Sequence, residues 1–575
     1  MSASWAENMR LRAQTARRTT GMVLDEERIL NLPVEDYPDN LVETWTGELQ
    51  TVRSRVRGDD PPLFPVQAEF CEALSRAPDR RGVVASVSVG DGKTLMSLLA
   101  GTVLDAKKVL ILLPASLRKQ NLEDQARWKP IYKVHPNITL CSYEKLSHPN
   151  HAFILDEIGA DLVIMDEAHS IASSNSTRTK RIFNYFKSRP KTRAIVMSGT
   201  LTSKGLNDYA HLVELALRQG SPLPTSFAIR ERWCAVLDPF GEFTDNDWSQ
   251  IRWLVGEAVG GMRARKRAAQ LAFQKRFKSA PGIVVSSSEN RVNASLVYAS
   301  WTPETAPEIE TALDSLRRTW TLPNGDEIAD ALEYSRAQKQ ISLGFYYVWV
   351  WPDGEPDFPW LETRCAWMAT VRNIVAFGRP GMDSPALVAR AAEQRRLSVN
   401  VLSVWDEWEA HRHKDPPPTE TRWLSDAPLR EAVEWTKEQP PLILWYRSRA
   451  VASKLEELGI RVFTPGSAPP SSAETCALSI SSYGQGIDGL QYLFSNQLVL
   501  EPASSGRSWE QMVGRTHRTG ATADVVNVHF YAALAFQSAM IKAKTEAKYI
   551  ERTTGTRQKL VYGSFGDSSD QDLLL

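Results

Sequence analysis

Residues 82–94 read GVVASVSVGDGKT, a short apolar run followed by a glycine-rich turn and a Lys-Thr pair. The run at 82–87 is rich in valine and too short for a helix, so it predicts a buried strand, with a helix beginning near Leu95. Glycines at 90 and 92 let backbone N–H groups turn inward around a phosphate, to which Lys93 adds a positive charge. The Thr94 hydroxyl suits Mg²⁺. Because the spacing is the shortened G-x-G-K-T form, a chance glycine turn remains an alternative.

Similar apolar runs recur in two series, separated by stretches of helical or loop character. The first series is 82–87, 109–113, 138–141, 162–165 and 194–197. The second series is 442–445, 461–463, 477–480, 497–500 and 525–530. Short runs rich in Val, Ile and Leu that alternate with helices are typical of βαβ units and of parallel sheets covered on both faces. The sequence therefore predicts an α/β fold with two parallel-sheet lobes.

The composition excludes several classes of protein. The chain has 575 residues, enough for three or four domains, and its 68 Lys and Arg balance its 68 Asp and Glu. A highly basic coat or histone-like protein is thereby excluded, although a local basic groove is not. The five cysteines are scattered without a C-x-x-C pair, so we expect no disulfide framework and no structural zinc. No apolar run approaches the length of about 18 residues that a membrane span needs, and no secretory signal is present, so we expect a cytoplasmic protein without membrane association.

An acidic pair follows the run at 162–165, in the segment Asp166-Glu167-Ala168-His169. Acidic side chains at the carboxyl end of a sheet strand lie where open α/β sheets bind their ligands. Asp166 would hold Mg²⁺ through water, and Glu167 would polarise an attacking water as general base. A solvated turn explains the pair equally well in isolation, but its position after the glycine-rich turn favours the catalytic interpretation.

Taken together, these segments resemble a known superfamily. Residues 90–94, 166–169 and 198–200 (Ser-Gly-Thr) resemble motifs I, II and III of the superfamily 2 helicases and translocases. Residues 63–67 (LFPVQ) are similar to the L-x-P-x-Q segment that reads adenine in the Swi2/Snf2-like branch. Residues 114–117 and 142–146 look like motifs Ia and Ib, which line the nucleic-acid track; ordinary loops after strands are the alternative.

The second lobe carries the later motifs. Residues 484–491 (GQGIDGLQ) resemble motif V, residues 509–520 (WEQMVGRTHRTG) resemble motif VI, and residues 442–448 are a weaker match to motif IV. On a helix, Gln511, Arg515 and Arg518 would share one face, which could look across a cleft at the γ-phosphate. Arginines supplied in this way are worth about 10³–10⁵ in rate in related NTPases. A solvated basic face is the alternative, and Asp488 departs from the Asn that is frequent in this branch.

The resemblance implies two RecA-like lobes in tandem with a mainly helical block between them. The expected divisions are an N-terminal helical arm (1–60), an ATP-binding lobe 1 (61–205), a Trp-rich inter-lobe region (206–435), lobe 2 (436–550) and a C-terminal tail, disordered at its end (551–575). Catalytic roles are implied for Lys93, Asp166, Glu167, Gln511, Arg515 and Arg518. Nucleotide binding is implied for Gln67, Gly90, Asp91, Gly92, Lys93, Thr94, Gly486 and Asp488, with Mg²⁺ on Thr94 and Asp166. Coupling is implied for His169, Ser198, Gly199 and Thr200, and nucleic-acid contact for Pro114, Ser116, Ser142, Tyr143, Ser448 and Ser481.

The function implied is an ATP-dependent DNA translocase or helicase that uses ATP and Mg²⁺. Duplex DNA is favoured as the track because this branch mostly moves along duplexes, and RNA is not excluded. A strand-separating helicase is the main alternative. A viral packaging ATPase, which would need a nuclease lobe, and an inactive nucleic-acid-binding scaffold are further alternatives. The compact size is similar to versions encoded by phages and mobile elements, which would place the protein in the host cytoplasm.

Two regions outside these motifs also bear on function. The inter-lobe region holds 13 of the 18 tryptophans, which suit either a helical core or base stacking. Its basic stretch at 262–278, which contains no acid, suits a helix laid along a phosphate backbone or a solvated face. At the C-terminus, residues 571–575 (QDLLL) resemble the Q-x-x-L-[LF] peptide with which bacterial proteins dock on the sliding clamp. The clamp is therefore a candidate partner.

Overall fold

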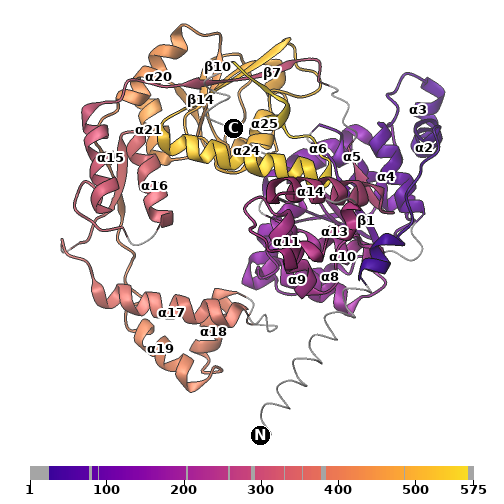
Figure 1. Cartoon of the computed structure of the whole chain (residues 1–575), viewed down its shortest axis with the longest axis horizontal. Helices are drawn as coiled ribbons and strands as arrows, with labels where there is room; N and C mark the ends of the chain where they lie inside the picture. Colours follow the sequence, from indigo (N-terminus) through magenta and orange to yellow (C-terminus); the bar gives the residue numbers. More distant parts are fainter. Residues whose placement is uncertain are drawn as a thin grey trace. The chain divides into compact units, whose positions relative to one another are not determined.

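The computed structural model describes residues 25–76, 81–88, 90–202, 205–256, 259–286, 292–328, 331–352, 354–376, 382, 384–484 and 486–566. The chain divides into two compact units. The first unit comprises residues 1–289 together with 545–558, and the second comprises residues 290–544 together with 559–575. Figure 1 draws the helices and strands, and labels many of them as they are named below.

A six-stranded parallel sheet forms the centre of the first unit, in the order β3-β2-β4-β5-β1-β6. Its strands are β1 (Gly82–Ser86), β2 (Val109–Leu113), β3 (Ile138–Ser142), β4 (Leu162–Met165), β5 (Arg193–Ser198) and β6 (Ile283–Val285). Every residue of β1, β2 and β4 is buried, as expected for strands of a parallel sheet that is covered on both faces.

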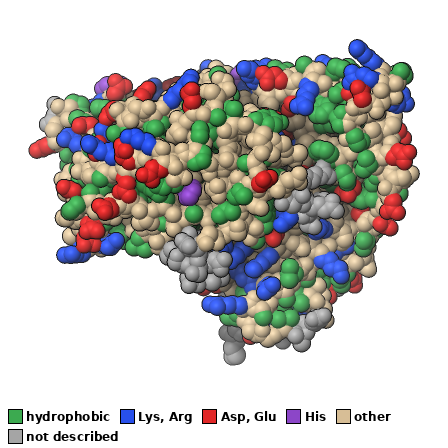
Figure 2. Space-filling model, turned by 90° about the horizontal axis from the view of Figure 1, so that it is seen from above, with side chains coloured by type: hydrophobic (Ala, Val, Ile, Leu, Met, Phe, Trp, Pro, Cys, Tyr) green, Lys and Arg blue, Asp and Glu red, His purple; other side chains and the backbone are tan. Residues whose placement is uncertain are grey.

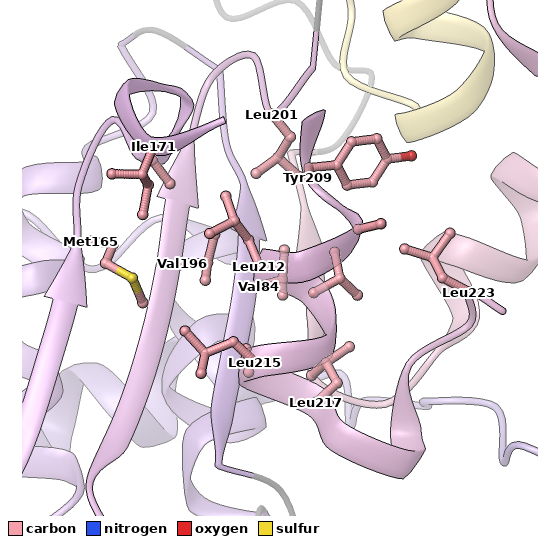
Figure 3. Close-up of a cluster of buried hydrophobic side chains, with 14 of the residues drawn as sticks. Val84, Met165, Ile171, Val196, Leu201, Tyr209, Leu212, Leu215, Leu217 and Leu223 are labelled. Carbon is pink, nitrogen blue, oxygen red and sulfur yellow. The ribbon is translucent and has the colours of Figure 1, made fainter. Parts of the chain in front are cut away.

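Helices cover both faces of this sheet. The helices of the first unit are α2 (Leu41–Leu49), α3 (Val52–Arg57), α4 (Pro65–Ser75), α5 (Lys93–Val103), α6 (Arg118–Trp128), α7 (Tyr143–Ser147), α8 (Ile154–Ile158), α9 (Thr177–Ser188), α10 (Ala210–Leu217), α11 (Phe227–Leu237), α12 (Asp245–Ser249), α13 (Arg252–Val255) and α14 (Met262–Ser279). Successive strand residues point to opposite faces. Val84 and Val196 therefore join the hydrophobic cluster that contains Leu212 of α10, drawn in Figure 3. Val83 and Ile195 join a second cluster with residues of α4 and α5.

The second unit contains a seven-stranded parallel sheet in the order β11-β12-β10-β13-β14-β7-β15. Its strands are β7 (Ser295–Trp301), β10 (Leu442–Tyr446), β11 (Arg461–Phe463), β12 (Cys476–Ser479), β13 (Asn496–Val499), β14 (Val525–Tyr531) and β15 (Ser564–Phe565). Its helices are α15 (Pro307–Thr319), α16 (Ala331–Ser342), α17 (Phe358–Ala376), α18 (Pro385–Glu393), α19 (Val399–Glu409), α20 (Ala427–Lys437), α21 (Arg449–Glu457), α22 (Ile480–Tyr483), α23 (Gly506–Val513) and α25 (Lys559–Tyr562). An antiparallel pair, β8 (Phe345–Trp349) with β9 (Thr419–Trp423), completes the unit.

The predicted fold class is confirmed: two parallel sheets with covering helices form an α/β fold that resembles tandem RecA-like lobes. All ten predicted strands are present, with ends that differ by at most one residue. The region 206–435 is mainly helical, as expected, but it also supplies four strands, β6 to β9. Because β6 joins the first sheet and β7 the second, the structure divides this region between the two units and does not set it apart.

The C-terminal part of the chain also departs from the expected division. Helix α24 (Leu534–Thr554) runs well past residue 550, and residues 545–558 belong to the first unit. The predicted tail therefore begins inside a helix. Its last nine residues, 567–575, lie outside the described residues and include the clamp-like peptide, as does the start of the predicted N-terminal arm, 1–24. No helix in the described ranges is both long enough and apolar enough to span a bilayer.

The tryptophans of the 206–435 region serve mainly as core residues. Six of the 13 are buried (Trp233, Trp248, Trp301, Trp360, Trp367 and Trp405), five are half-buried (Trp253, Trp351, Trp408, Trp423 and Trp435), and two are exposed (Trp320 and Trp349). Trp367 and Trp405 pack edge to face with ring centroids 4.8 Å apart and form the centre of a small cluster built by α17, α18 and α19. On the face shown in Figure 2, acidic and basic side chains are interspersed over most of the surface, in keeping with a net charge of zero.

Candidate nucleotide-binding site

The glycine-rich turn lies where the sequence predicts it, between the carboxyl end of β1 and the start of α5. Gly90 and Gly92 have φ angles of 100° and 79°, in the left-handed region that favours glycine. Gly92 is the N-cap of α5, so the first free N–H groups of that helix face the turn. A half-buried helix start of this kind is suited to a phosphate group. Lys93 Nζ donates to the carbonyl oxygen of Val87 at 3.0 Å and folds back over the turn.

Gln67 is buried on α4 against the same turn. Its Nε2 donates to the carbonyl oxygen of Gly92 at 3.3 Å, and its Oε1 accepts from the N–H of Phe64 at 2.8 Å. A Cβ at Gly92 would collide with this amide. In this structure Gln67 therefore supports the turn, and adenine recognition by its amide stays a prediction.

The acidic pair lies at the carboxyl end of β4, close to Lys93. Glu167 Oε1 is 3.9 Å from Lys93 Nζ, and Glu167 Oε2 is 3.2 Å from His169 Nδ1. The Ser198 hydroxyl, at the end of β5, lies 3.5 Å from Glu167 Oε2 and 3.4 Å from His169 Nδ1. Glu167 itself has a φ of 50°, a conformation that non-glycine residues seldom adopt and that clusters at functional sites. Three predicted motifs thus meet around one carboxylate.

Motifs II and III are held together by further hydrogen bonds. The N–H of Thr200 donates to Ser198 Oγ at 3.2 Å, which fixes the turn after β5, and Gly199 is buried within that turn. Tyr143 donates its hydroxyl to the carbonyl oxygen of Asp166 at 2.9 Å and is fully buried. The prediction that Tyr143 contacts nucleic acid is therefore wrong, because its ring is enclosed in the core and positions Asp166.

The electrostatics of this cluster fit a divalent cation. Burial, and then the neighbouring Glu167 carboxylate, raise the pKa of Asp166, while the Lys93 ammonium opposes that rise. The cluster thus contains two carboxylates, Asp166 and Glu167, and one ammonium, Lys93, all largely shielded from solvent. Mg²⁺ would offset the repulsion between the two carboxylates, and it is usually held by one or two carboxylates, waters and substrate phosphates. Asp166 and Thr94 fit that donor set. Among the described residues, no three His, Cys, Asp or Glu side chains form a metal site.

The second unit contains the residues predicted for motifs V and VI. Arg518 NH1 is 3.1 Å from Asp488 Oδ1, and although burial raises the pKa of Asp488, Arg518 holds it below its ordinary value. Arg515 is buried, with Nε donating to the carbonyl oxygen of Gln511 at 3.1 Å and NH1 to that of Ile487 at 2.7 Å. Arg515 therefore ties motif VI to motif V, while Arg518 contacts a partly exposed carboxylate.

The expectation that Gln511, Arg515 and Arg518 share one helix face is wrong. Helix α23 ends at Val513, and its C-cap is Gly514, so both arginines lie in the following turn. The chain leaves the helical path because the next residues point into the core: Gln497 Nε2 donates to Thr516 Oγ1, and His517 Nε2 donates to the carbonyl oxygen of Ala294 at 2.9 Å. Gly486, in the motif V turn, has a φ of 75°.

The residues predicted for nucleic-acid contact in the first unit lie in two environments. Ser116 is exposed, whereas Pro114 is buried at the end of β2. Ser142 is the N-cap of α7, and its side chain accepts from the N–H of Lys145 at 3.2 Å. Asp91 lies in the glycine-rich turn, where its N–H donates to the carbonyl oxygen of Ser88 at 3.4 Å.

In the second unit, Ser448 is bound by a carboxylate that the sequence did not single out. Glu501 is buried, and it accepts from the N–H groups of Arg447 and Ser448, at 2.6 and 2.7 Å, and from Ser448 Oγ at 2.5 Å. It therefore fixes the start of α21. Ser481 is exposed and lies 2.8 Å from Ser479 through their hydroxyl oxygens.

Two contacts that residues 545–558 make within the first unit were not predicted. Thr556 Oγ1 lies 2.7 Å from Ser86 Oγ, at the end of β1. The Tyr549 hydroxyl donates to Asp238 Oδ1 at 3.3 Å, and Asp238 Oδ1 also accepts from the N–H of Leu206 at 2.8 Å, in the segment after motif III. A lone Asp, Tyr or Thr has no spacing pattern, so no sequence signal identifies these residues.

Burial raises the pKa of Asp238 to about 7, in spite of the hydrogen bonds that favour its ionised form. The folded state therefore binds this proton more tightly than the unfolded chain, whose Asp titrates near 4. The contribution of this proton to the free energy of unfolding is complete below about pH 4 and is lost as the pH rises to about 7. We expect Asp238→Asn to melt at a higher temperature than the wild type at pH 8, with a gain on the order of 2–4 kcal/mol that shrinks toward pH 5. Thermal melts between pH 5 and pH 8 check this prediction, with Asp105→Asn, at an exposed position, as the control. A difference in melting temperature that does not change with pH would contradict it.

Comparison with known proteins adds to this geometry. Residues 60–203 match the family "Type III restriction enzyme, res subunit". This part of the chain is similar to that helicase family. The match supports a superfamily 2 helicase domain with ATPase function and agrees with motifs I to III. No curated protein has a significant sequence match to the chain.

Among solved structures, the helicase Lhr of Mycobacterium smegmatis, bound to single-stranded DNA and AMP-PNP, is 11% identical with a TM-score of 0.39. The alignment covers 91% of this chain and 52% of Lhr, so the chain spans about half the length of that protein.

Proposed function

We propose that the chain is an ATP-dependent DNA translocase of superfamily 2, similar to the Swi2/Snf2-like branch, that couples ATP hydrolysis to movement along duplex DNA. The observation that carries the proposal is the network around Glu167, which links Lys93 to Ser198 and His169. The carboxylate suited to orient the attacking water is thereby bonded to the segment that leads away from the nucleotide. A change at the γ-phosphate can then alter the position of motif III.

The residues of the candidate nucleotide-binding site each have a role in this proposal. Lys93 and the N–H groups of the glycine-rich turn bind the phosphates, and Glu167 accepts a proton from the attacking water. Asp166 and Thr94 would hold Mg²⁺, which would neutralise phosphate charge when bound. By resemblance to motif VI, Arg518 acts on the same triphosphate, with Gln511 and Arg515 in support.

The substrate class is tested by measuring phosphate release while titrating duplex DNA, single-stranded DNA and RNA. All three nucleic acids are compared at equal nucleotide concentration. We expect duplex DNA to give the largest stimulation of hydrolysis. Lys93→Ala should abolish both basal and stimulated hydrolysis, because the phosphates lose their principal cation. Stimulation by RNA alone would replace the DNA assignment, and hydrolysis unaffected by any nucleic acid would contradict the proposed function. Complete absence of hydrolysis would favour an inactive scaffold.

Translocation and strand separation are distinguished by a second assay. Displacement of the third strand of a DNA triplex, with the underlying duplex left intact, supports a translocase. Separation of a fluorescently labelled duplex under the same conditions supports the strand-separating alternative instead.

A further inference from the structure

A basic hollow lies between α14 and the last turns of α24, and both of these segments belong to the first unit. Its volume is about 320 Å³, at the lower end of the range of about 300–1,000 Å³ in which ligand pockets usually fall. Five of its lining residues are cationic: Arg263, Lys266 and Arg267 from α14, and Lys548 and Arg552 from α24. No acidic side chain lines it.

The α14 side of the hollow is one face of a well-anchored helix. Arg263, Lys266 and Arg267 lie at positions i, i+3 and i+4, so they share a face. The helix is held by Phe273 and Phe277, which are fully buried in the core of the first unit. The cations are thus presented by a rigid element.

Within the basic stretch at 262–278, the structure restricts the residues available for phosphate contact to this N-terminal face. Arg265 pairs with Asp245 at 2.7 Å, and Arg276 donates to the carbonyl oxygens of Ile29 and Leu32 at 3.0 and 2.6 Å. These two arginines have structural partners. The structure therefore does not support contact between a phosphate backbone and the whole length of α14.

The α24 side is equally fixed. Lys548 and Arg552 are one turn apart and share a face. Tyr549, between them, is buried and bonded to Asp238, and Gln274 Nε2 donates to the carbonyl oxygen of Glu551 at 2.5 Å. The two helices therefore hold their cations in a set arrangement around the hollow.

The positive charges that line the hollow are not neutralised by carboxylates that line it. Arg263, Arg267, Lys548 and Arg552 form no ion pair with any carboxylate of the described residues, and Lys266 Nζ donates only to backbone carbonyl oxygens, at 3.2 and 3.0 Å. Burial, and then the nearby Arg552, lower the pKa of Lys548. Like charges that are held together on rigid helices repel one another unless an anion lies between them.

We propose that this hollow binds backbone phosphates of the nucleic acid along which the protein moves, an inference that rests on the proposed function. Arginine forks match phosphate oxygens in a bidentate manner, and lysine adds a point charge. The polar lining consists largely of donors, and the Gln270 amide is already bonded to the carbonyl oxygen of Leu237 at 2.7 Å. A lining of this kind suits phosphates, which position a strand without reading its sequence.

The test is binding of a fluorescein-labelled DNA duplex, followed by anisotropy over a series of salt concentrations. The variant is Arg263→Gln with Arg267→Gln, both exposed, and the matched control is Lys275→Gln, an exposed residue of α14 that does not line the hollow. We expect the double variant to bind about tenfold more weakly, with the slope of log K against log salt smaller by roughly 1.8 for two lost phosphate contacts on duplex DNA. The control should bind as the wild type does, and hydrolysis without DNA should be unchanged in both.

Three outcomes overturn the proposal. Wild-type DNA affinity and salt slope in the double variant would exclude the hollow as a DNA contact. Equal weakening by Lys275→Gln would show only a general effect of charge. Stabilisation of the wild type, but not of the double variant, by inorganic tripolyphosphate without any change in DNA affinity would show a site for small polyanions. Stimulation of wild-type hydrolysis by DNA, measured in parallel, separates failure of this site from failure of the proposed function.

Discussion

Replacing Glu167 by Gln is expected to lower ATP hydrolysis by about 10²–10⁴-fold while ATP affinity changes little. The glutamine amide keeps the shape of the side chain and can still contact His169 and Ser198, but it cannot accept a proton from water. Because Lys93 and the glycine-rich turn are untouched, the phosphates should still be bound. The measurement is phosphate release at saturating ATP, together with the affinity for a fluorescent ATP analogue.

The matched control for this prediction is Glu157→Gln, which makes the same chemical change at an exposed position of α8 in the same unit. That variant should hydrolyse ATP at the wild-type rate. If Glu167→Gln retained hydrolysis within a few-fold of the wild type, Glu167 would not be the general base. If it lost ATP affinity to the same extent as hydrolysis, its role would be binding.

Removing the Arg518 side chain is expected to lower DNA-stimulated hydrolysis by about 10³–10⁵-fold, with ATP affinity largely retained. Arg518 is the candidate because its guanidinium is only partly buried and its ion pair is with Asp488, a carboxylate that is itself half exposed. Arg515 is less suited, since two backbone carbonyl oxygens already hold it. Steady-state phosphate release at saturating ATP and DNA, beside ATP affinity, checks this prediction.

A control for Arg518→Ala is Arg461→Ala, which removes an exposed arginine from β11 of the same unit. The control should leave stimulated hydrolysis unchanged. Intact hydrolysis in Arg518→Ala would refute the assignment of motif VI. A parallel loss in both variants would point to a general effect of charge on DNA binding.

The local parts of the site could be predicted from the sequence. The turn at Gly90–Gly92 and the acidic pair at Asp166 and Glu167 follow short apolar strands, and in a parallel sheet the ends of such strands lie at one edge. The physical requirement is contained in a few consecutive residues, so the pattern is readable without the fold. Their meeting around Glu167 follows once the strand order is known, because β5 lies between β4 and β1 and pairs with both.

The rest depended on long-range contacts that leave no local pattern. The end of α23 before Arg515 is set by the burial of Thr516 and His517, which periodicity cannot show. The contact of Thr556 with Ser86 joins residues that are 470 positions apart. Strand β6 has only three residues and follows a helix, so its addition to the first sheet depends on pairing with β1.

The central claim is that one triphosphate, bound by Lys93 and Glu167, is also acted on by Arg518 in the transition state. Its most direct test is the affinity of the protein for ADP with aluminium fluoride, which mimics the transferring phosphoryl group, relative to its affinity for ADP alone. Transition-state analogues bind about 10²–10⁸-fold more tightly than ground-state ligands. The account predicts that Arg518→Ala loses most of that extra affinity while its affinity for ADP and that of Arg461→Ala for both ligands stay at wild-type values. An undiminished preference for the aluminium fluoride complex in Arg518→Ala would contradict it.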